Sequence, residues 1–221
     1  MPGGRRRLRS QPVAGRQRGA GFHVALGLLA LQVIDSLVSW GILVGYRFAG
    51  AGEVILLVAD LAPTLLFVLI SAAVAVRVRR GRNFAVNRYA IVYLSVATIQ
   101  VIVNIVLLVS GGEPFRDSLI WGLAVLGGAY LLVVAVFTGW YWLFDKMTVG
   151  GAFDFPEAEV IPGFRPNIVD YLFISFNTNS TFGPTAELVK SRYVKVLMML
   201  QTALSLAILL VFVARLTGLA K

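Results

Sequence analysis

Residues 118–144 read SLIWGLAVLGGAYLLVVAVFTGWYWLF, which is twenty-seven consecutive residues without a charged side chain. A transmembrane helix needs about 20 predominantly apolar residues at about 1.5 Å each. The stretch is therefore long enough to cross a bilayer. We take it as the first predicted span and work outward from it in both directions.

Four other stretches are also predominantly apolar and long enough to span, although the first two contain Asp35 and Asp60. They cover approximately 22–46, 54–76, 89–112 and 196–214. The composition agrees, because 58% of the chain is hydrophobic and only 14% is charged, against roughly a quarter charged in soluble domains. The stretch 22–46 is longer than the apolar region of a signal peptide, so we expect a retained anchor. The sequence predicts an all-α, polytopic integral membrane protein with five transmembrane helices.

The net charge of +9 is concentrated outside these spans. Six arginines lie in the first eighteen residues, within a segment, 1–21, that we expect to be a disordered basic tail. Five more lie in 77–88, between two spans. A nucleic-acid partner would need a basic face on a folded domain, and the sequence leaves no room for one. We expect these arginines to contact the anionic headgroups of a lipid bilayer instead.

The basic residues also predict an orientation. If the N-terminus is cytoplasmic and five spans alternate, the inside segments hold sixteen basic residues and the outside segments hold four. The excess of Lys and Arg on cytoplasmic loops then favours this arrangement. We expect a multi-pass protein of the plasma membrane with its N-terminus in the cytoplasm.

The segment between the last two spans is the least uniform part of the chain. Residues 145–166 are loop-like, and 167–176 (NIVDYLFISF) form an apolar stretch too short to span. Residues 177–185 (NTNSTFGPT) are polar and end in Gly-Pro. A short helix, a Thr/Ser/Gly string and a full span follow one another in a pore loop, where backbone carbonyls replace the hydration shell of an ion. We therefore predict a re-entrant half-helix over 167–176 and a filter-like loop over 177–185.

These motifs resemble the pore module of potassium channels, in which an aromatic-rich helix precedes T-x-T-T-V-G-Y-G-D. The resemblance covers about 118–218, with 118–144 as the outer helix and 196–214 as the inner helix. It implies a homotetramer, because one chain supplies one loop, and it makes Ser205 a hinge candidate. The same region is similar to uncharacterised bacterial integral membrane proteins with a Y-x-x-F-T-x-x-T-x-F-x-P-T-type string. The implied filter-like residues are Thr178, Ser180, Thr181, Phe182, Gly183, Pro184 and Thr185.

The sequence departs from that channel pattern at three positions. Pro184 stands at the filter tyrosine, Thr185 at the second glycine and Ala186 at the aspartate. Proline fixes φ near −65°, and a threonine is strained at positive φ. We therefore expect passage of monovalent cations without high potassium selectivity.

The orientation and the resemblance conflict. The charge count puts 145–195 on the cytoplasmic side, whereas the loop of a potassium channel enters from outside. Three interpretations stay open: an inverted loop, as in glutamate-receptor channels; a span count that is wrong by one; or a similarity that reflects packing without conduction.

Polar side chains also occur within the other spans. Asp35, Asp60, Gln100 and Asn104 are the intramembrane polar residues of interest. We expect Gln32, Asp35 and Ser39 to share one helix face, and Asp60 to face Asn104 across two helices. Such groups act either as interhelical hydrogen bonds, worth about 0.6 kcal/mol each, or as a proton or cation relay.

No nucleophile–base pair, metal-ligand cluster or phosphate-binding loop is evident, and the chain has no cysteine and one histidine. We therefore expect no enzyme activity, no catalytic residue, no metal and no cofactor. The predicted organisation is a tail (1–21), a three-helix membrane domain (22–112) and a pore-like module (113–221). Three functions follow from it: an ion-channel-like oligomer, a non-conducting scaffold or sensor, or a proton-coupled transporter that uses the two aspartates.

Overall fold

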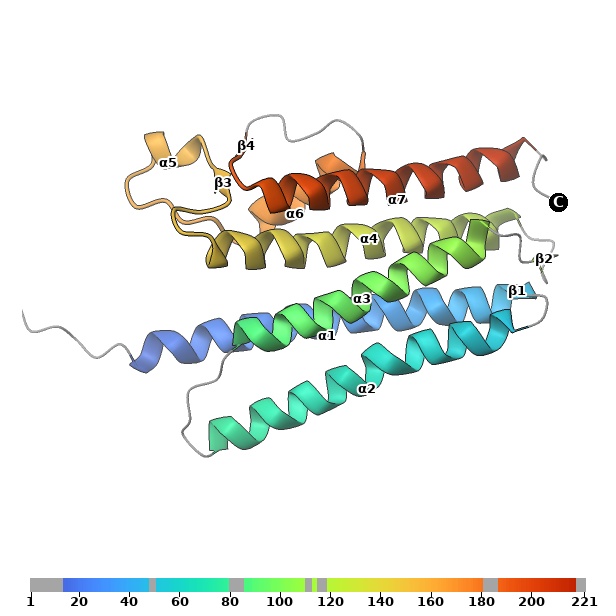
Figure 1. Cartoon of the computed structure of the whole chain (residues 1–221), viewed down its shortest axis with the longest axis horizontal. Helices are drawn as coiled ribbons and strands as arrows, with labels where there is room; N and C mark the ends of the chain where they lie inside the picture. Colours follow the sequence, from blue (N-terminus) through green and yellow to red (C-terminus); the bar gives the residue numbers. More distant parts are fainter. Residues whose placement is uncertain are drawn as a thin grey trace, which may run out of the picture.

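The structure is a computed structural model, which describes residues 14–47, 51–79, 86–109, 113–114, 119–180 and 187–217. Long helices lie side by side along one axis of the molecule (Figure 1). The helices are α1 (Ala14–Gly45), α2 (Gly52–Arg79), α3 (Val86–Val109), α4 (Leu119–Met147), α5 (Glu157–Val160), α6 (Ile168–Asn179) and α7 (Arg192–Leu216). Two short antiparallel pairs join β1 (Tyr46–Arg47) to β2 (Glu113–Pro114) and β3 (Phe153–Asp154) to β4 (Leu188–Val189).

Three of these helices are long and apolar enough to cross a membrane, which identifies the chain as a membrane protein. They comprise residues 87–109, 120–147 and 192–216, with mean hydropathies of 2.4, 2.3 and 2.5. The described apolar stretches of α1 and α2, Leu29–Ile42 and Leu61–Ile70, are shorter. The helical, membrane-spanning class predicted from sequence is confirmed at this level.

Most helix boundaries lie within a few residues of the predicted ones, with two exceptions. Helix α1 begins at Ala14, so residues 14–21, expected in the disordered tail, are helical instead. Helix α6 ends at Asn179 rather than at 176. Asn177, Thr178 and Asn179 therefore belong to the helix and not to the loop that we predicted. A polar residue does not end a helix when its side chain finds hydrogen-bond partners in the helical conformation.

Helix α4 is the central element of the bundle. It packs against α1 and α3 on one side and against α6 and α7 on the other, while α2 packs against α1 and α3. Helices α1 and α4 approach closely at two glycines, because a Cβ at Gly41 would lie 3.2 Å from Val125 and a Cβ at Gly128 would lie 3.0 Å from Val38. Small residues at such contacts let helix backbones approach one another in a membrane.

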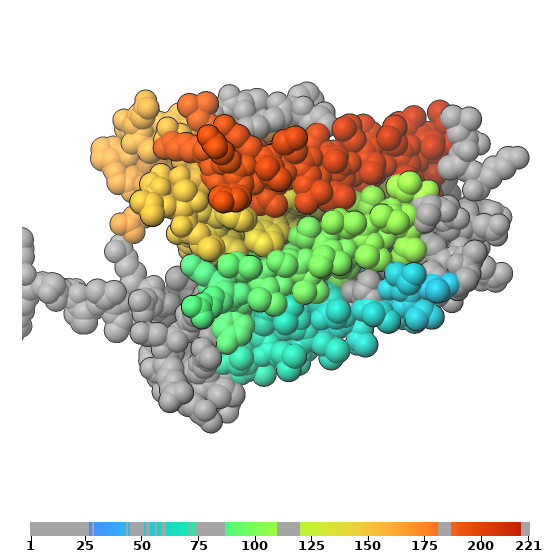
Figure 2. All heavy atoms as spheres, in the orientation of Figure 1, coloured from blue at the N-terminus to red at the C-terminus, as the bar shows by residue number. Residues whose placement is uncertain are grey.

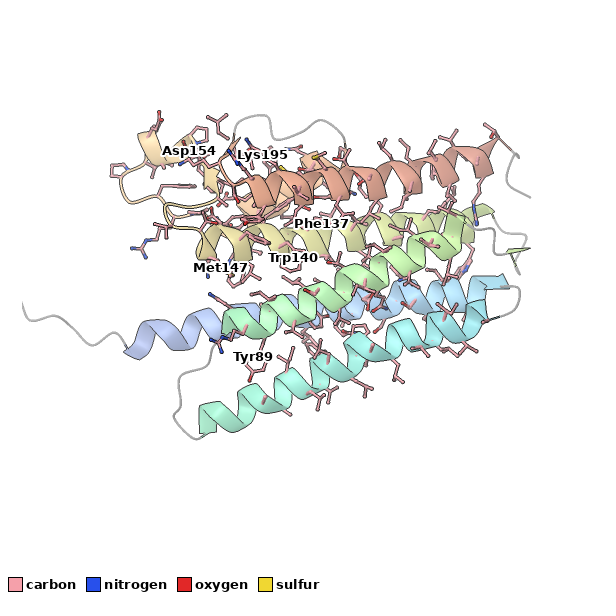
Figure 3. The ribbon with its side chains drawn as sticks, viewed as in Figure 1. Tyr89, Phe137, Trp140, Met147, Asp154 and Lys195 are labelled. Carbon is pink, nitrogen blue, oxygen red and sulfur yellow. The ribbon has the colours of Figure 1, made fainter. Side chains whose placement is uncertain are left out.

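The two ends of the bundle differ in charge. The start of α1, the end of α2, the start of α3 and the end of α4 lie at one end, together with β3, α5 and β4 (Figure 1). Figure 3 places Tyr89, Met147, Asp154 and Lys195 there as well. The basic residues of these elements are Arg16, Arg18, Arg77, Arg79, Arg88, Lys146, Arg165, Lys190, Arg192 and Lys195. We call this end the basic end; at the other end the described basic residues are Arg47 and Arg215.

Candidate functional site

The path of the chain between α4 and α7 defines the site. Residues 153–154 pair with 188–189, so the chain leaves the basic end after β3 and has returned to it by β4. Between the two strands, α6 runs back into the bundle between α4 and α7. Its twelve residues measure about 18 Å at 1.5 Å per residue, roughly half of the length needed to cross a bilayer.

The start of α6 is capped by its own side chains. Asn167 accepts a hydrogen bond from the Val169 N–H at 2.7 Å, and Asp170 accepts one from the Asn167 N–H at 2.6 Å. This reciprocal capping box satisfies two N–H groups that an α-helix leaves unpaired at its start. The helix start is therefore fixed locally by sequence, at the residue where we predicted it.

A carboxylate at the end of α4 ties this capped start to the bundle. Asp145 accepts hydrogen bonds from the Ala152 and Phe153 N–H groups at 2.6 and 3.1 Å, and from the Tyr171 hydroxyl at 2.7 Å. The chain turns back towards Asp145 at Gly151, which has φ +78° and whose Cβ would lie 3.1 Å from the carboxylate. Burial and the bond to Asp145 raise the pKa of Tyr171 above its usual value, so the phenol stays neutral.

One face of α6 is buried and the other is apolar and exposed. The buried side chains are Tyr171, Ile174, Ser175, Thr178 and Asn179, at intervals of three and four residues. The exposed ones are Val169, Leu172, Phe173 and Phe176. The polar groups of this helix therefore point into the protein, towards α4 and α7.

Gln201 of α7 connects α6 to both neighbouring helices. Its amide nitrogen donates to the Ser175 carbonyl at 2.8 Å, to the Ser175 hydroxyl at 3.0 Å and to Asn179 Oδ1 at 3.3 Å. Its amide oxygen accepts from the Tyr141 hydroxyl at 2.5 Å. Gln201 is fully buried, so these bonds replace the water that the amide would otherwise need.

The end of α6 is held in the same way. Asn179 accepts a hydrogen bond from the Ser205 hydroxyl and donates to the Tyr130 carbonyl at 3.3 Å. The Tyr130 and Ser180 hydroxyls lie 3.0 Å apart and share a hydrogen bond. Tyr130 and Ser205 lie near the middle of α4 and α7, so α6 ends about halfway along both helices.

We call these bonded side chains the α6 network: Tyr141, Ser175, Asn179, Gln201 and Ser205. Three residues that we expected in the pore module, Thr178, Ser180 and Ser205, make hydrogen bonds within the chain. Thr178 is buried and donates to the Ile174 carbonyl at 2.8 Å. Ser180 donates to the Phe176 carbonyl at 2.8 Å. Ser205, the hinge candidate, bonds Asn179 inside a helix that continues from Arg192 to Leu216. The remaining filter-like residues, Thr181, Phe182, Gly183, Pro184 and Thr185, lie outside the described part of the chain.

A cavity of about 310 Å³ lies beyond the end of α6, between α4 and α7. Asn179, Ser180, Ser205 and Tyr130 line it where α6 ends, and apolar residues of α4 and α7 line the rest.

The polar residues of the first three helices that we predicted to be intramembrane form a second group. Gln32, Asp35 and Ser39 are all buried, in agreement with the shared face that we predicted. Tyr93 donates to Gln32 at 2.9 Å, Gln32 donates to Thr64 at 2.9 Å, and Gln100 donates to Ser39 at 3.1 Å. Asn104 is buried, and within the described residues its amide has no hydrogen-bond partner.

These bonds fix the register of α1, α2 and α3. Gln32 is level with Thr64 and Tyr93, and Ser39 is level with Gln100. Residue 60 of α2 therefore lies near the level of Asp35, about seven residues or roughly 10 Å from the level of Asn104. The side chain of Asp60 lies outside the described residues, so its pairing with Asn104 stays a prediction, but the register favours the neighbourhood of Asp35.

Sequence reasoning did not assign a role to the two residues that organise the α6 network, Asn179 and Gln201. The signal available was an amide side chain in a largely apolar span and an Asn near the end of the half-helix. Neither indicates which partner it bonds, because that depends on how α6 and α7 are placed.

Comparisons with known proteins add no relative to this description: no protein-family model, curated protein or solved structure matches the chain.

Proposed function

We propose that this chain is a pore-loop membrane protein that passes monovalent cations as an oligomer, with α6 as the half-helix and 181–185 as the filter-like segment. One observation carries the proposal: α6 enters the bundle from the basic end, stops halfway along α4 and α7, and the chain returns to the same end. In this proposal α1, α2, α3, α4 and α7 are the five spans, and α6 is re-entrant.

The direction of α6 supports passage of a cation. The carbonyl end of a helix carries a partial negative charge, equivalent to about half an elementary charge. That end of α6 lies in the interior of the bundle, next to the oxygens of Asn179 and Ser180 and directly before the filter-like segment. A cation at this depth would be stabilised by it, and an anion would be repelled.

The surface of α7 is consistent with an oligomer. Only 22% of its most apolar stretch is buried inside the protein, against 44% for the corresponding stretches of α3 and α4. Figure 2 shows α7, in red, along the surface of the molecule. A pore needs several copies of the loop, and α7 offers an apolar surface on which neighbouring copies can pack. In this proposal the oligomer is a tetramer in the plasma membrane, and the basic end faces the cytoplasm.

The test is cation flux in liposomes that contain the purified full-length protein. Wild type is expected to pass potassium and sodium at similar rates, and Gly183→Val, which removes the conformational freedom of a filter-like glycine, is expected to abolish flux. Gly27→Val is the matched control, because a Cβ at Gly27 of α1 meets no atom within 4 Å. Absence of flux from wild type would refute the channel.

A non-conducting scaffold or sensor is the second candidate, and a specific observation favours it. The buried polar side chains Ser175 and Asn179 of α6 bond within one chain, to Gln201, Ser205 and Tyr130. In this reading α6 is a packing element. A monomer or dimer in detergent, together with no flux, would support it.

Buried Asp35 is the observation that favours the third candidate, a proton-coupled transporter. A carboxyl at this depth is costly and is often functional. The same liposomes separate this candidate from a channel. Cation flux that needs a pH gradient and is lost in Asp35→Asn would favour the transporter.

A further inference from the structure

The proposed function leaves the cavity beyond α6 unexplained. Leu126 and Gly127 of α4 face Ile208, Leu209 and Phe212 of α7 across it. The polar groups occur where α6 ends, and they are already bonded: Asn179 to Ser205 and Tyr130, and Ser180 to Phe176. Apolar side chains make up most of this lining, which matches a hydrocarbon chain.

The cavity lies within the part of α4 and α7 that would occupy one leaflet of a bilayer. Helix α4 extends eleven residues from Tyr130 back to Leu119, and α7 extends eleven residues from Ser205 to Leu216. Both helix ends lie at the end of the bundle opposite the basic end (Figure 1). At 1.5 Å per residue each distance is about 16 Å, close to half of a hydrocarbon core of about 30 Å.

A basic side chain, Arg215, lies near the outer end of this cavity. Ser205, Ile208 and Phe212 line the cavity, and Arg215 follows them at the same helical spacing of three and four residues. Arg215 therefore lies on the cavity face of α7, in the last turn of the helix. Basic side chains at the ends of membrane helices bind the phosphates of anionic lipids, and a guanidinium can donate two parallel hydrogen bonds to a phosphate.

We propose that the cavity between α4 and α7 is a binding site for one acyl chain of an anionic phospholipid. The lipid belongs to the leaflet at the C-terminal end of α7, its phosphate binds Arg215, and its chain ends against Asn179 and Ser180. The site is independent of whether the protein conducts, because it is built within a single chain.

The test uses the full-length protein in nanodiscs that contain equal amounts of phosphatidylglycerol and phosphatidylcholine with the same acyl chains. After extraction into mild detergent, native mass spectrometry counts the lipids retained per chain. Wild type is expected to retain one lipid, predominantly phosphatidylglycerol. A phosphatidylcholine of the same chain length is the internal comparison, since it differs in the headgroup alone.

Gly127→Leu tests the acyl-chain site. A Cβ at Gly127 meets no atom within 4 Å, so the larger side chain can enter the cavity without a clash. Lipid retention is expected to fall by about tenfold, because the added side chain overfills the space that the acyl chain needs. Gly27→Leu in α1, where a Cβ is equally unobstructed, is the matched control and should retain lipid as wild type does. Leu209→Trp is a second cavity-filling variant should Gly127→Leu fold poorly.

Arg215→Gln tests the headgroup site. It is expected to keep the retained lipid but to remove the preference for phosphatidylglycerol, whereas Arg192→Gln at the other end of α7 should keep the preference. Wild type without retained lipid, or cavity-filling variants that retain as much lipid as wild type, would overturn the proposal. The proposal would also be overturned if the wild-type protein is an oligomer without retained lipid and the Gly127→Leu variant is a monomer. That result would indicate that a second copy of the chain occupies the cavity.

Discussion

Two groups of buried polar residues lie inside this bundle, and they differ in whether each amide side chain is bonded. Around α6, Gln201 and Asn179 each bond to more than one neighbouring segment, so three helices are joined in one network. Among α1, α2 and α3, Gln32 likewise bonds to Thr64 and Tyr93, and Gln100 bonds to Ser39. Asn104 is buried without a hydrogen bond among the described residues.

The difference follows from how much apolar surface each helix can bury. Helix α6 has twelve residues and leaves an apolar face exposed, so it buries fewer apolar side chains than a full-length helix does. Long helices such as α3 and α4 bury apolar side chains along their whole length. The half-helix therefore depends on hydrogen bonds for its position, and the three-helix region depends on them less.

The largest expected effect is at Gln201. Replacement by Leu would remove the acceptor of the Tyr141 hydroxyl and the donors to Ser175 and Asn179. A buried polar group that loses its partner costs about 1–3 kcal/mol. We expect the free energy of unfolding in detergent to fall by about 2–3 kcal/mol. Gln100→Leu, in the other group, is the matched comparison and should cost less. Equal losses would break the contrast between the two regions.

The next effect concerns the end of α6. Asn179→Ala and Ser205→Ala remove the two sides of one hydrogen bond, so the double variant should be less destabilised than the sum of the single ones. We expect a coupling energy of about 1 kcal/mol from unfolding measurements. If the losses in unfolding free energy are additive, Ser205 does not fix the position of α6. The interpretation of Ser205 as a hinge would then be favoured again.

A smaller effect with a defined pH dependence is expected at Tyr171. Its bond to Asp145 contributes about 1 kcal/mol, which Tyr171→Phe should remove. The folded state raises the pKa of this phenol, so the stabilisation is fully present below the unfolded pKa of about 10 and is lost as the pH rises through the folded pKa. The wild-type advantage over Tyr171→Phe should thus be constant from about pH 7 to 9 and decline only above about pH 10. A decline near neutral pH would contradict the assignment.

The smallest effect, and one of opposite sign, is expected at Asn104. Its amide has no hydrogen-bond partner among the described residues, so Asn104→Leu exchanges an unsatisfied buried group for an apolar one of similar size. Thermal unfolding should show no loss, or a gain of up to about 1 kcal/mol. A clear loss would indicate that Asn104 has a partner outside the described residues. The pairing with Asp60 predicted from sequence is tested in the same way: if it exists despite the register, Asp60→Ala should lower stability as much, and the double variant no further.

Much of the architecture could be predicted from local sequence. The charge-free stretch 118–144 predicted a helix that the structure extends from Leu119 to Met147. The apolar stretch 167–176 predicted the half-helix, and the structure begins it at Ile168, after a capping box that Asn167 and Asp170 form across three residues. The clustered basic residues predicted that one end of the bundle would hold most of the charge, and the structure gathers the elements that carry them at one end.

The end of the half-helix could not be predicted in this way. The string NTN at 177–179 is typical of a loop when it is read alone, since Asn favours turns and helix ends. In the structure it is helical, because Asn179 finds partners on Gln201 and Ser205, which follow it in the chain by more than twenty residues. The expected lining of a pore by Thr178 was likewise a local interpretation, and its side chain instead bonds within α6.

The sequence by itself determined that the chain lies in a membrane, where its helices run and which end carries the positive charge. Those properties depend on hydrophobicity, on spacing along one helix and on the positions of charges. Only the tertiary structure decided that α6 stops halfway between α4 and α7, that Gln201 joins three helices, and that a cavity remains beyond Asn179. These features depend on contacts between distant segments, and a polar residue in an apolar span does not specify its partner until the helices pack.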